Sequence, residues 1–167
     1  MGVSGSGKTT VASALARELG AELIEADDHH PPANVEKMRA GIPLDDEDRR
    51  PWLATLARLL RERHARDERT VLACSALKRA YRDVLRSAVP PAETFTIELD
   101  ADPDTVRQRM ASRTGHFMPA SLLESQLATL EHLADDERGL IVNADQPPAD
   151  VVASTVAGIR GSLGVRR

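Results

Sequence analysis

The sequence predicts an α/β fold in which a parallel sheet lies between two layers of helices. Three observations support this fold class. Residues 2–9 read GVSGSGKT, which fits the phosphate-binding loop pattern G-x-x-x-x-G-K-[ST]. A helical pattern begins directly after that loop. Short apolar runs then alternate with helical patterns, as in parallel sheets covered on both faces. The chain therefore reads as one P-loop NTPase domain over residues 1–167.

The phosphate-binding loop (P-loop) has the residues that binding a polyphosphate requires. Gly5 and Gly7 allow backbone angles closed to other residues, so that successive N–H groups turn toward the phosphates. The following helix adds the positive end of its dipole. Lys8 brings a compact charge to the β- and γ-phosphates, and the Thr9 hydroxyl is a ligand for Mg²⁺. The alternative is a flexible N-terminus rich in Gly and Ser. The predicted nucleotide site comprises Gly2, Val3, Ser4, Gly5, Ser6, Gly7, Lys8, Thr9 and Thr10.

Composition excludes several function classes. The net charge of −4 gives no electrostatic argument for binding nucleic acid or an anionic membrane surface. No apolar run approaches the length of a membrane span. Cys74 is the single cysteine, so no internal disulfide is available, which suits the reducing cytoplasm. With one Trp, one Tyr and two Phe, the core must consist mostly of aliphatic side chains.

Hydrophobic periodicity predicts the elements of the first half of the chain. Gly20 ends the first helix, and Pro51 falls in the first turn of the third helix, where its missing N–H does no harm. The run 71–74 is continuously apolar, as in a strand buried on both faces. In order, we expect a helix over 8–19, a strand over 21–26, a helix over 33–40, a helix capped by Asp46 or Asp48, and a strand over 71–74.

The second half continues the alternation. Asp102 and Pro103 form a cap and first-turn signal for a helix. In order, we expect a helix over 75–86, a strand over 95–99, a helix over 102–113, a helix from Pro119, a strand over 139–143 and a closing helix over 151–159. Because parallel sheets bind ligands beyond the carboxyl ends of their strands, the loops after residues 26, 74, 99 and 143 should share one edge with the P-loop.

Two acids at this edge are candidates for chemistry. Residues i and i+2 of a strand share a face, so Glu25 and Asp27 could point into one site. We assign Glu25 to the water shell of Mg²⁺ and Asp27 to the acceptor hydroxyl. The alternative is that both are surface acids that end a strand. Asp100 resembles a Walker-B acid, but its strand is interrupted by polar residues and we assign it no role.

Basic side chains supply the remaining candidates. Arg109 and Arg113 lie one helical turn apart before a break, which indicates a lid that closes over the transferred phosphate; a solvated helix end is the alternative. Lys78 and Arg82 have the same spacing and indicate an anionic acceptor, with Arg49 as a third cation. His29 and His30 match no compact zinc spacing, so His30 is assigned to a polar substrate.

Several motifs together resemble the short, P-loop type of gluconokinase over essentially the whole chain from Gly2. The motifs are GVSGSGKT, DDHHP at 27–31, NVEKM at 34–38, GIPLDDEDRRPWL at 41–53, CSALK at 74–78, Tyr81-Arg82, Gly115-His-Phe117, Ser125-Gln126, Thr129-Leu130 and Asp145-Gln-Pro147. This combination is far more specific than the P-loop alone.

The resemblance implies an ATP:D-gluconate 6-phosphotransferase that uses Mg²⁺ and feeds the pentose phosphate or Entner–Doudoroff routes. It also implies a nucleoside-monophosphate-kinase-like fold with a lid at about 113–125, and often a homodimer. The resemblance carries the acceptor role onto Asp27, which joins Lys8 and Arg113 as the catalytic residues, with Arg109 also at the nucleotide. The implied substrate contacts are Asp27, His30, Arg49, Lys78, Arg82, His116 and Gln126.

The chain departs from the family pattern in two places. An acid-Gly-Asp run is replaced by Glu25-Ala26-Asp27, whose longer carboxylate should still reach a metal-bound water. The apolar strand that precedes the P-loop in the family, and lies in mid-sheet, is absent. A parallel sheet without it leaves backbone groups unsatisfied. We therefore expect a native start about 6–15 residues earlier.

Three other readings remain. A related small-molecule kinase, for shikimate or another hydroxy acid, would share the P-loop and the lid. A catalytically impaired nucleotide-binding remnant would bind ATP without transferring phosphate. A nucleotide-switch GTPase requires an Asn-Lys-x-Asp motif, which the sequence does not contain.

Overall fold

A computed structural model describes residues 1–112 and 121–164. Most of the predicted lid, including Arg113 and His116, falls outside these ranges. The described elements alternate between strand and helix as the sequence predicts, and several bounds agree to the residue: helix α1 is Lys8–Leu19 and strand β4 is Gly139–Asn143.

The strands form two parallel pairs. In one, β1 (Glu22–Glu25) runs beside β2 (Thr70–Ala73); in the other, β3 (Thr96–Asp100) runs beside β4. Met1 and Gly2 join the pairs. The Met1 carbonyl accepts from the Leu99 N–H at 2.9 Å, its amine donates to the Ile97 carbonyl, and the Gly2 N–H donates to Ser75 O at 3.2 Å. The predicted parallel arrangement is confirmed, although the described strands pair two by two.

Helices α1 and α7 (Pro148–Gly164) cover one face of the strands. Their apolar stripes meet residues of β3 and β4 in one core cluster, in which Val11 and Leu15 of α1 lie with Leu99, Val142 and Ile159. The left-handed Gly20 closes α1, as its position after the last apolar residue predicts.

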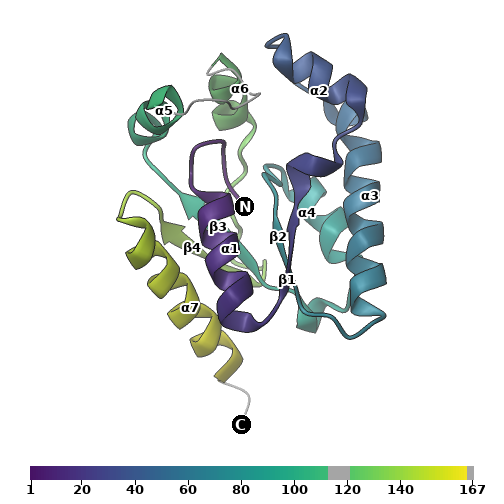
Figure 1. Ribbon diagram of the computed structural model, residues 1–167, viewed down its shortest axis with the longest axis vertical. Helices are drawn as coiled ribbons and strands as arrows, with labels where there is room; N and C mark the ends of the chain where they lie inside the picture. Colours follow the sequence, from purple (N-terminus) through teal and green to yellow (C-terminus); the bar gives the residue numbers. More distant parts are fainter. Residues whose placement is uncertain (113–120, 165–167) are drawn as a thin grey trace.

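Helices α3 (Asp46–His64) and α4 (Arg79–Arg86) form the layer on the other side, as Figure 1 shows. Their core contains Trp52, Leu56 and Tyr81. The cap of α3 is Asp45 rather than the predicted Asp46 or Asp48. Its carboxylate accepts from the Asp48 N–H, and the Asp48 carboxylate accepts from the Asp45 N–H. This reciprocal pair satisfies two backbone donors at once, which explains the preference.

The remaining elements surround the P-loop at the carboxyl ends of the strands. Figure 1 shows α5 (Pro103–Ser112) and α6 (Ser121–Thr129) on one side of the loop, and α2 (Pro32–Arg39) on the other. Two short 3₁₀ turns, η1 (Ala26–His29) and η2 (Pro91–Glu93), complete the described structure. Among the described helices, none is both long enough and apolar enough to cross a bilayer.

Candidate active site

The P-loop adopts the conformation that its glycines predict. Gly5 has φ +83° and Gly7 has φ +95°, a region that side-chain-bearing residues rarely enter. A Cβ on Gly5 would also lie 3.0 Å from side-chain atoms of Val106 and Met110 on α5. Gly7 is the residue before α1, so the loop delivers its N–H groups to the positive end of that helix.

The cation and the metal ligand of the predicted nucleotide site lie at the end of the loop. The Lys8 ammonium donates to the Val3 carbonyl at 2.9 Å, which holds it across the loop. The Thr9 hydroxyl donates to Glu25 Oε2 at 3.3 Å. The other carboxylate oxygen of Glu25 is buried and has no hydrogen-bond partner among the described residues. Burial raises the pKa of Glu25, and the neighbouring carboxylates of Asp27 and Asp28 act in the same direction.

This arrangement fits the predicted site for Mg²⁺. A hydroxyl and an under-satisfied carboxylate are oxygen ligands of the kind that Mg²⁺ takes directly or through water. The structure brings together Thr9, at the start of α1, and Glu25, at the end of β1, the two residues that the sequence separately assigns to the metal.

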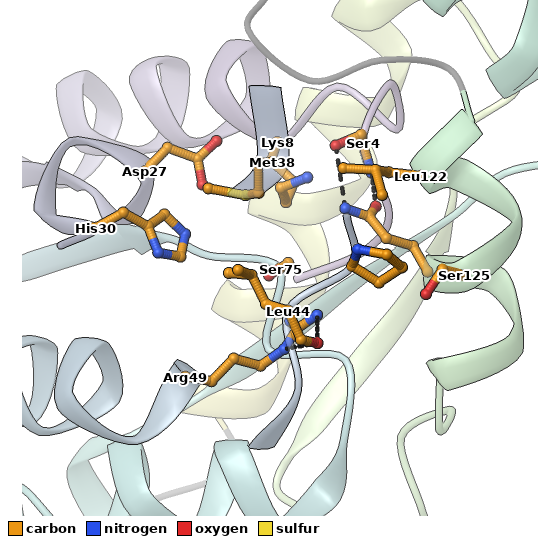
Figure 2. Close-up of a pocket in the computed structure, with 12 residues that line it drawn as sticks. Ser4, Lys8, Asp27, His30, Met38, Leu44, Arg49, Ser75, Leu122 and Ser125 are labelled. Atoms are coloured by element: carbon orange, nitrogen blue, oxygen red, sulfur yellow. Dashed lines mark hydrogen bonds between the residues drawn. The ribbon is translucent and has the colours of Figure 1, made fainter. Parts of the chain in front are cut away.

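One small cavity lies directly beside the loop (Figure 2). Its volume of about 30 Å³ leaves room for roughly two water molecules. The wall combines the P-loop, the turn after β1, the segment before α3, and α6. The lining residues are Ser4, Lys8, Asp27, His30, Met38, Pro43, Leu44, Arg49, Ser75, Leu122, Ser125 and Gln126.

Asp27 and His30 reach this cavity from the turn η1. The imidazole of His30 stacks on Trp52 with ring centroids 4.2 Å apart and an interplanar angle of 13°. Trp52 Nε1 in turn donates to the Ala26 carbonyl at 2.7 Å, so the indole fixes both ends of the turn that carries Asp27. Burial lowers the pKa of His30 to about 4, which leaves the ring neutral at pH 7. Its Nδ1 is buried without a hydrogen-bond partner among the described residues.

Arg49 enters from the other side of the cavity, from the first turns of α3 (Figure 2). Its Nε and Nη2 donate to the Leu44 carbonyl at 3.3 and 3.2 Å. Of the described residues that line the cavity, Lys8 and Arg49 carry the full positive charges. The cavity therefore has a carboxylate and a phosphate-directed lysine on one side and a guanidinium on the other.

Gln126 lies on the cavity wall and is also bound to the P-loop. Its Oε1 accepts from the Ser4 N–H at 2.7 Å, and its Nε2 donates to Ser4 Oγ at 3.4 Å (Figure 2). The residue is 9% exposed. The sequence predicted a substrate contact here, and the structure adds a link between α6 and the loop.

Arg82 does not line the cavity, so the structure does not bring this predicted substrate contact together with the others. The side chain is 2% exposed and its Nε and Nη2 donate to Glu137 at 2.7 and 2.6 Å. Its Nη1 donates to the carbonyl of Glu131 at 2.9 Å and, more weakly, to those of Ala76 and Leu77. A buried guanidinium requires such partners, so the residue is committed to the core.

Lys78 is likewise absent from the cavity wall. Its ammonium donates to both oxygens of Asp46, at 2.7 and 3.0 Å, and lies 5.6 Å from the ring centre of Tyr81. The structure therefore places Lys78 apart from the predicted substrate contacts that line the cavity. Arg109 is on α5 and is half-buried. Thr10 is exposed on the first turn of α1, whereas Val3 is buried among Leu77, Val106 and Leu123.

Some cavity residues were missed by sequence reasoning. Ser75 follows β2 at the carboxyl edge, and that position was the available signal. Ser125 had a weaker signal, since it precedes Gln126 in a quoted motif. Met38 and Leu122 carry no chemical signal; they meet with Leu44 in an apolar contact between α2 and α6 that no pattern within either helix indicates.

These features define a class of protein. A parallel α/β fold, a P-loop with its lysine and hydroxyl ligand, and an adjoining cavity with an acid are typical of the P-loop kinases. A family model described as an AAA domain matches residues 1–133. An APS kinase from Mycobacterium tuberculosis shares the fold, with a TM-score of 0.65 at 16% identity over 96% of this chain and 94% of that one.

More similar proteins narrow the class. A gluconokinase from Gluconobacter oxydans (strain 621H) is 53% identical over 91% of this chain and 84% of its own length. The crystal structure of a gluconokinase from Sinorhizobium meliloti 1021 superposes with a TM-score of 0.87 at 45% identity, covering 99% of this chain and 92% of that one. The chain belongs to the gluconokinase family of P-loop kinases.

Proposed function

We propose that the protein transfers the γ-phosphoryl group of ATP to the C6 hydroxyl of D-gluconate. The observation that carries the proposal is the cavity itself, in which Lys8, Asp27 and Arg49 meet beside the P-loop. A kinase for a sugar acid requires these groups: a cation for the phosphate, an acid for the hydroxyl and a cation for the carboxylate. Gluconokinases that resemble the chain over most of its length support the same substrate.

The nucleotide half of the site consists of the P-loop amides and Lys8. The amides and the positive end of α1 hold the phosphate oxygens, and Lys8 exchanges the Val3 carbonyl for the β- and γ-phosphates. Thr9 and Glu25 would hold Mg²⁺, directly and through water, and the ion supplies charge neutralisation between the phosphates. Arg113 and Arg109 as phosphate-facing cations, and the lid at about 113–125, stay predictions.

The acceptor half orients gluconate. Arg49 binds the carboxylate, and the neutral imidazole of His30 offers Nδ1 to a sugar hydroxyl. The opposite end of the substrate then lies at Asp27, next to the γ-phosphate. Asp27 aligns the C6 hydroxyl and accepts its proton as the oxygen bonds to phosphorus and ADP leaves. His116, outside the described residues, stays a predicted contact.

A coupled assay of ADP formation across a panel of acceptors tests this proposal. We expect turnover with D-gluconate and at least about 10²-fold lower kcat/KM with shikimate, a cyclic acid that lacks the open six-carbon chain between the carboxylate and the terminal hydroxyl. ATP binding without turnover of any acceptor would instead indicate the nucleotide-binding remnant. A cytoplasmic location and a homodimer remain expectations, to be tested by fractionation and by sedimentation.

A further inference from the structure

Tyr81 lies directly behind the cation that we assign to the acceptor. The residue is 5% exposed, on α4, and does not line the cavity. The guanidinium carbon of Arg49 is 5.5 Å from the centre of its ring. At this distance a cation is attracted to the ring quadrupole, and the planar guanidinium favours a fixed orientation against an aromatic face.

The hydrogen bonds of Arg49 within the protein leave its Nη1 to bind a ligand. Nε and Nη2 are taken by the Leu44 carbonyl, and no described residue accepts a hydrogen bond from Nη1. A long arginine side chain loses much rotamer freedom when it binds a carboxylate. The Tyr81 ring and the Leu44 carbonyl remove that freedom in advance, because they hold the plane and one edge of the guanidinium.

Asp46 is the group that could disturb this arrangement. Its carboxylate accepts from the Tyr81 hydroxyl and attracts Arg49, which contributes to lowering the Asp46 pKa. Lys78 occupies both oxygens of Asp46, and this pair is the first cause of the lowered pKa. Asp27 and His30 are the other titratable groups that face Arg49. Lys78 therefore keeps Asp46 from competing with a bound carboxylate for Arg49.

We propose that Tyr81 is a positioning residue that holds Arg49 for the acceptor carboxylate, and that the Lys78–Asp46 pair protects this arrangement. The inference rests on the proposed function, since it gives Arg49 the carboxylate of gluconate. It also gives Lys78, which does not line the cavity, a role in substrate binding. Lys78 acts through Asp46 and Arg49 rather than by touching the substrate.

Steady-state kinetics of Tyr81→Leu and Tyr81→Phe test the proposal. Loss of the ring should raise the KM for gluconate about 5- to 20-fold with kcat and the KM for ATP within about twofold. Tyr81→Phe keeps the ring face and should stay within about threefold of wild type. The preference for gluconate over the neutral D-glucitol should fall in Tyr81→Leu only. Arg50→Met, which removes the neighbouring exposed cation paired with Glu47, is the matched control and should change nothing.

A second set of variants avoids the buried ring. Lys78→Met should raise the KM for gluconate, and Lys78→Met combined with Asp46→Asn should restore it, because no carboxylate then competes for Arg49. Unchanged KM values in both Tyr81→Leu and Lys78→Met would overturn the proposal, as would equal losses in kcat and ATP affinity. If the unmodified protein does not phosphorylate gluconate at all, the proposed function is what fails. Turnover of gluconate with an unaffected KM in these variants rejects the roles of Tyr81 and of the Lys78–Asp46 pair, but not the proposed function.

Discussion

Asp27 carries the chemical step in the proposed mechanism, and it lies at the cavity on a turn that Trp52 holds from behind. Asp27→Asn preserves the shape of the side chain but removes its ability to accept the hydroxyl proton. We expect kcat to fall about 10²-fold or more, with the affinity for ATP little changed. Single-turnover kinetics and calorimetric titration with a non-hydrolysable ATP analogue measure the two quantities. An unchanged kcat would remove Asp27 from the reaction.

His30 should make stability depend on pH. Its folded pKa is about 4 and its ordinary value is 6.5, because burial disfavours the charged ring. The unfolded chain therefore binds more protons between these values, so the free energy of unfolding should decrease as pH falls from about 6.5 to 4. Urea unfolding of His30→Gln should show a shallower slope in this window. His29→Gln, which leaves the Trp52 stack intact, is the control and should keep the wild-type slope.

At the residue scale, the sequence indicated the location of local side chains well and their distant partners poorly. Lys8, Thr9, Glu25 and Asp27 lie in or next to short motifs whose backbone determines where the side chains point. The partner of Arg82 is Glu137, more than fifty positions away, and no pattern near Arg82 indicates it. From the sequence alone, a basic residue close to a predicted site is therefore assigned to the ligand. Only the folded structure shows that Arg82 is paired with the buried Glu137.

At the scale of the elements, helix α6 is held against the P-loop by the hydrogen bond from the Ser4 N–H to Gln126 Oε1. Gln126→Leu would leave the Ser4 N–H buried without the amide oxygen that accepts it. An unmade buried hydrogen bond costs about 1–3 kcal/mol, so ATP should bind about 5- to 150-fold more weakly if the loop relaxes little. Calorimetry measures this, and Ser125→Ala, on the same cavity wall, serves as the control. Loss of gluconate affinity with unchanged ATP affinity would instead favour the substrate contact predicted from sequence.

Helix α4 depends on the ion pair between Arg82 and Glu137. Arg82 holds Glu137 well below its ordinary pKa, so this contribution to stability is present above about pH 4.5 and is lost as pH falls further. Arg82→Met should cost about 3 kcal/mol of unfolding free energy, since Arg86 still contacts the buried carboxylate at 2.8 Å. Adding Glu137→Leu should recover most of the loss. Chemical unfolding without such recovery would contradict the paired role.

Element bounds were predictable where periodicity and end signals agree, as in α1 with Gly20 and β4 with its continuous apolar run. The sequence predicted Asp46 or Asp48 as the N-cap of α3, whereas the structure has Asp45. An aspartate suits the cap at all three positions, and only the backbone geometry distinguishes them. The apolar meeting of α2 with α6 at Met38 and Leu122 depends on how the elements pack, so neither helix pattern contains it.

On the scale of the whole molecule, the site lies where the two strand pairs, the P-loop and the flanking helices converge. Met38, Leu44 and Leu122 form an apolar part of the cavity wall, contributed by three separate segments. The parallel topology was predictable from the alternation of elements, whereas the size of the cavity depends on side-chain packing across three elements.

The most direct test of the account is the position of the phosphate on the product. The protein is incubated with ATP, Mg²⁺ and D-gluconate, and the product is examined by phosphorus–proton correlation NMR. Because Arg49 and Asp27 lie on opposite sides of the cavity, we predict one phosphomonoester, coupled to the protons of C6. A phosphate on any other carbon, or no phosphorylated gluconate, would contradict the account.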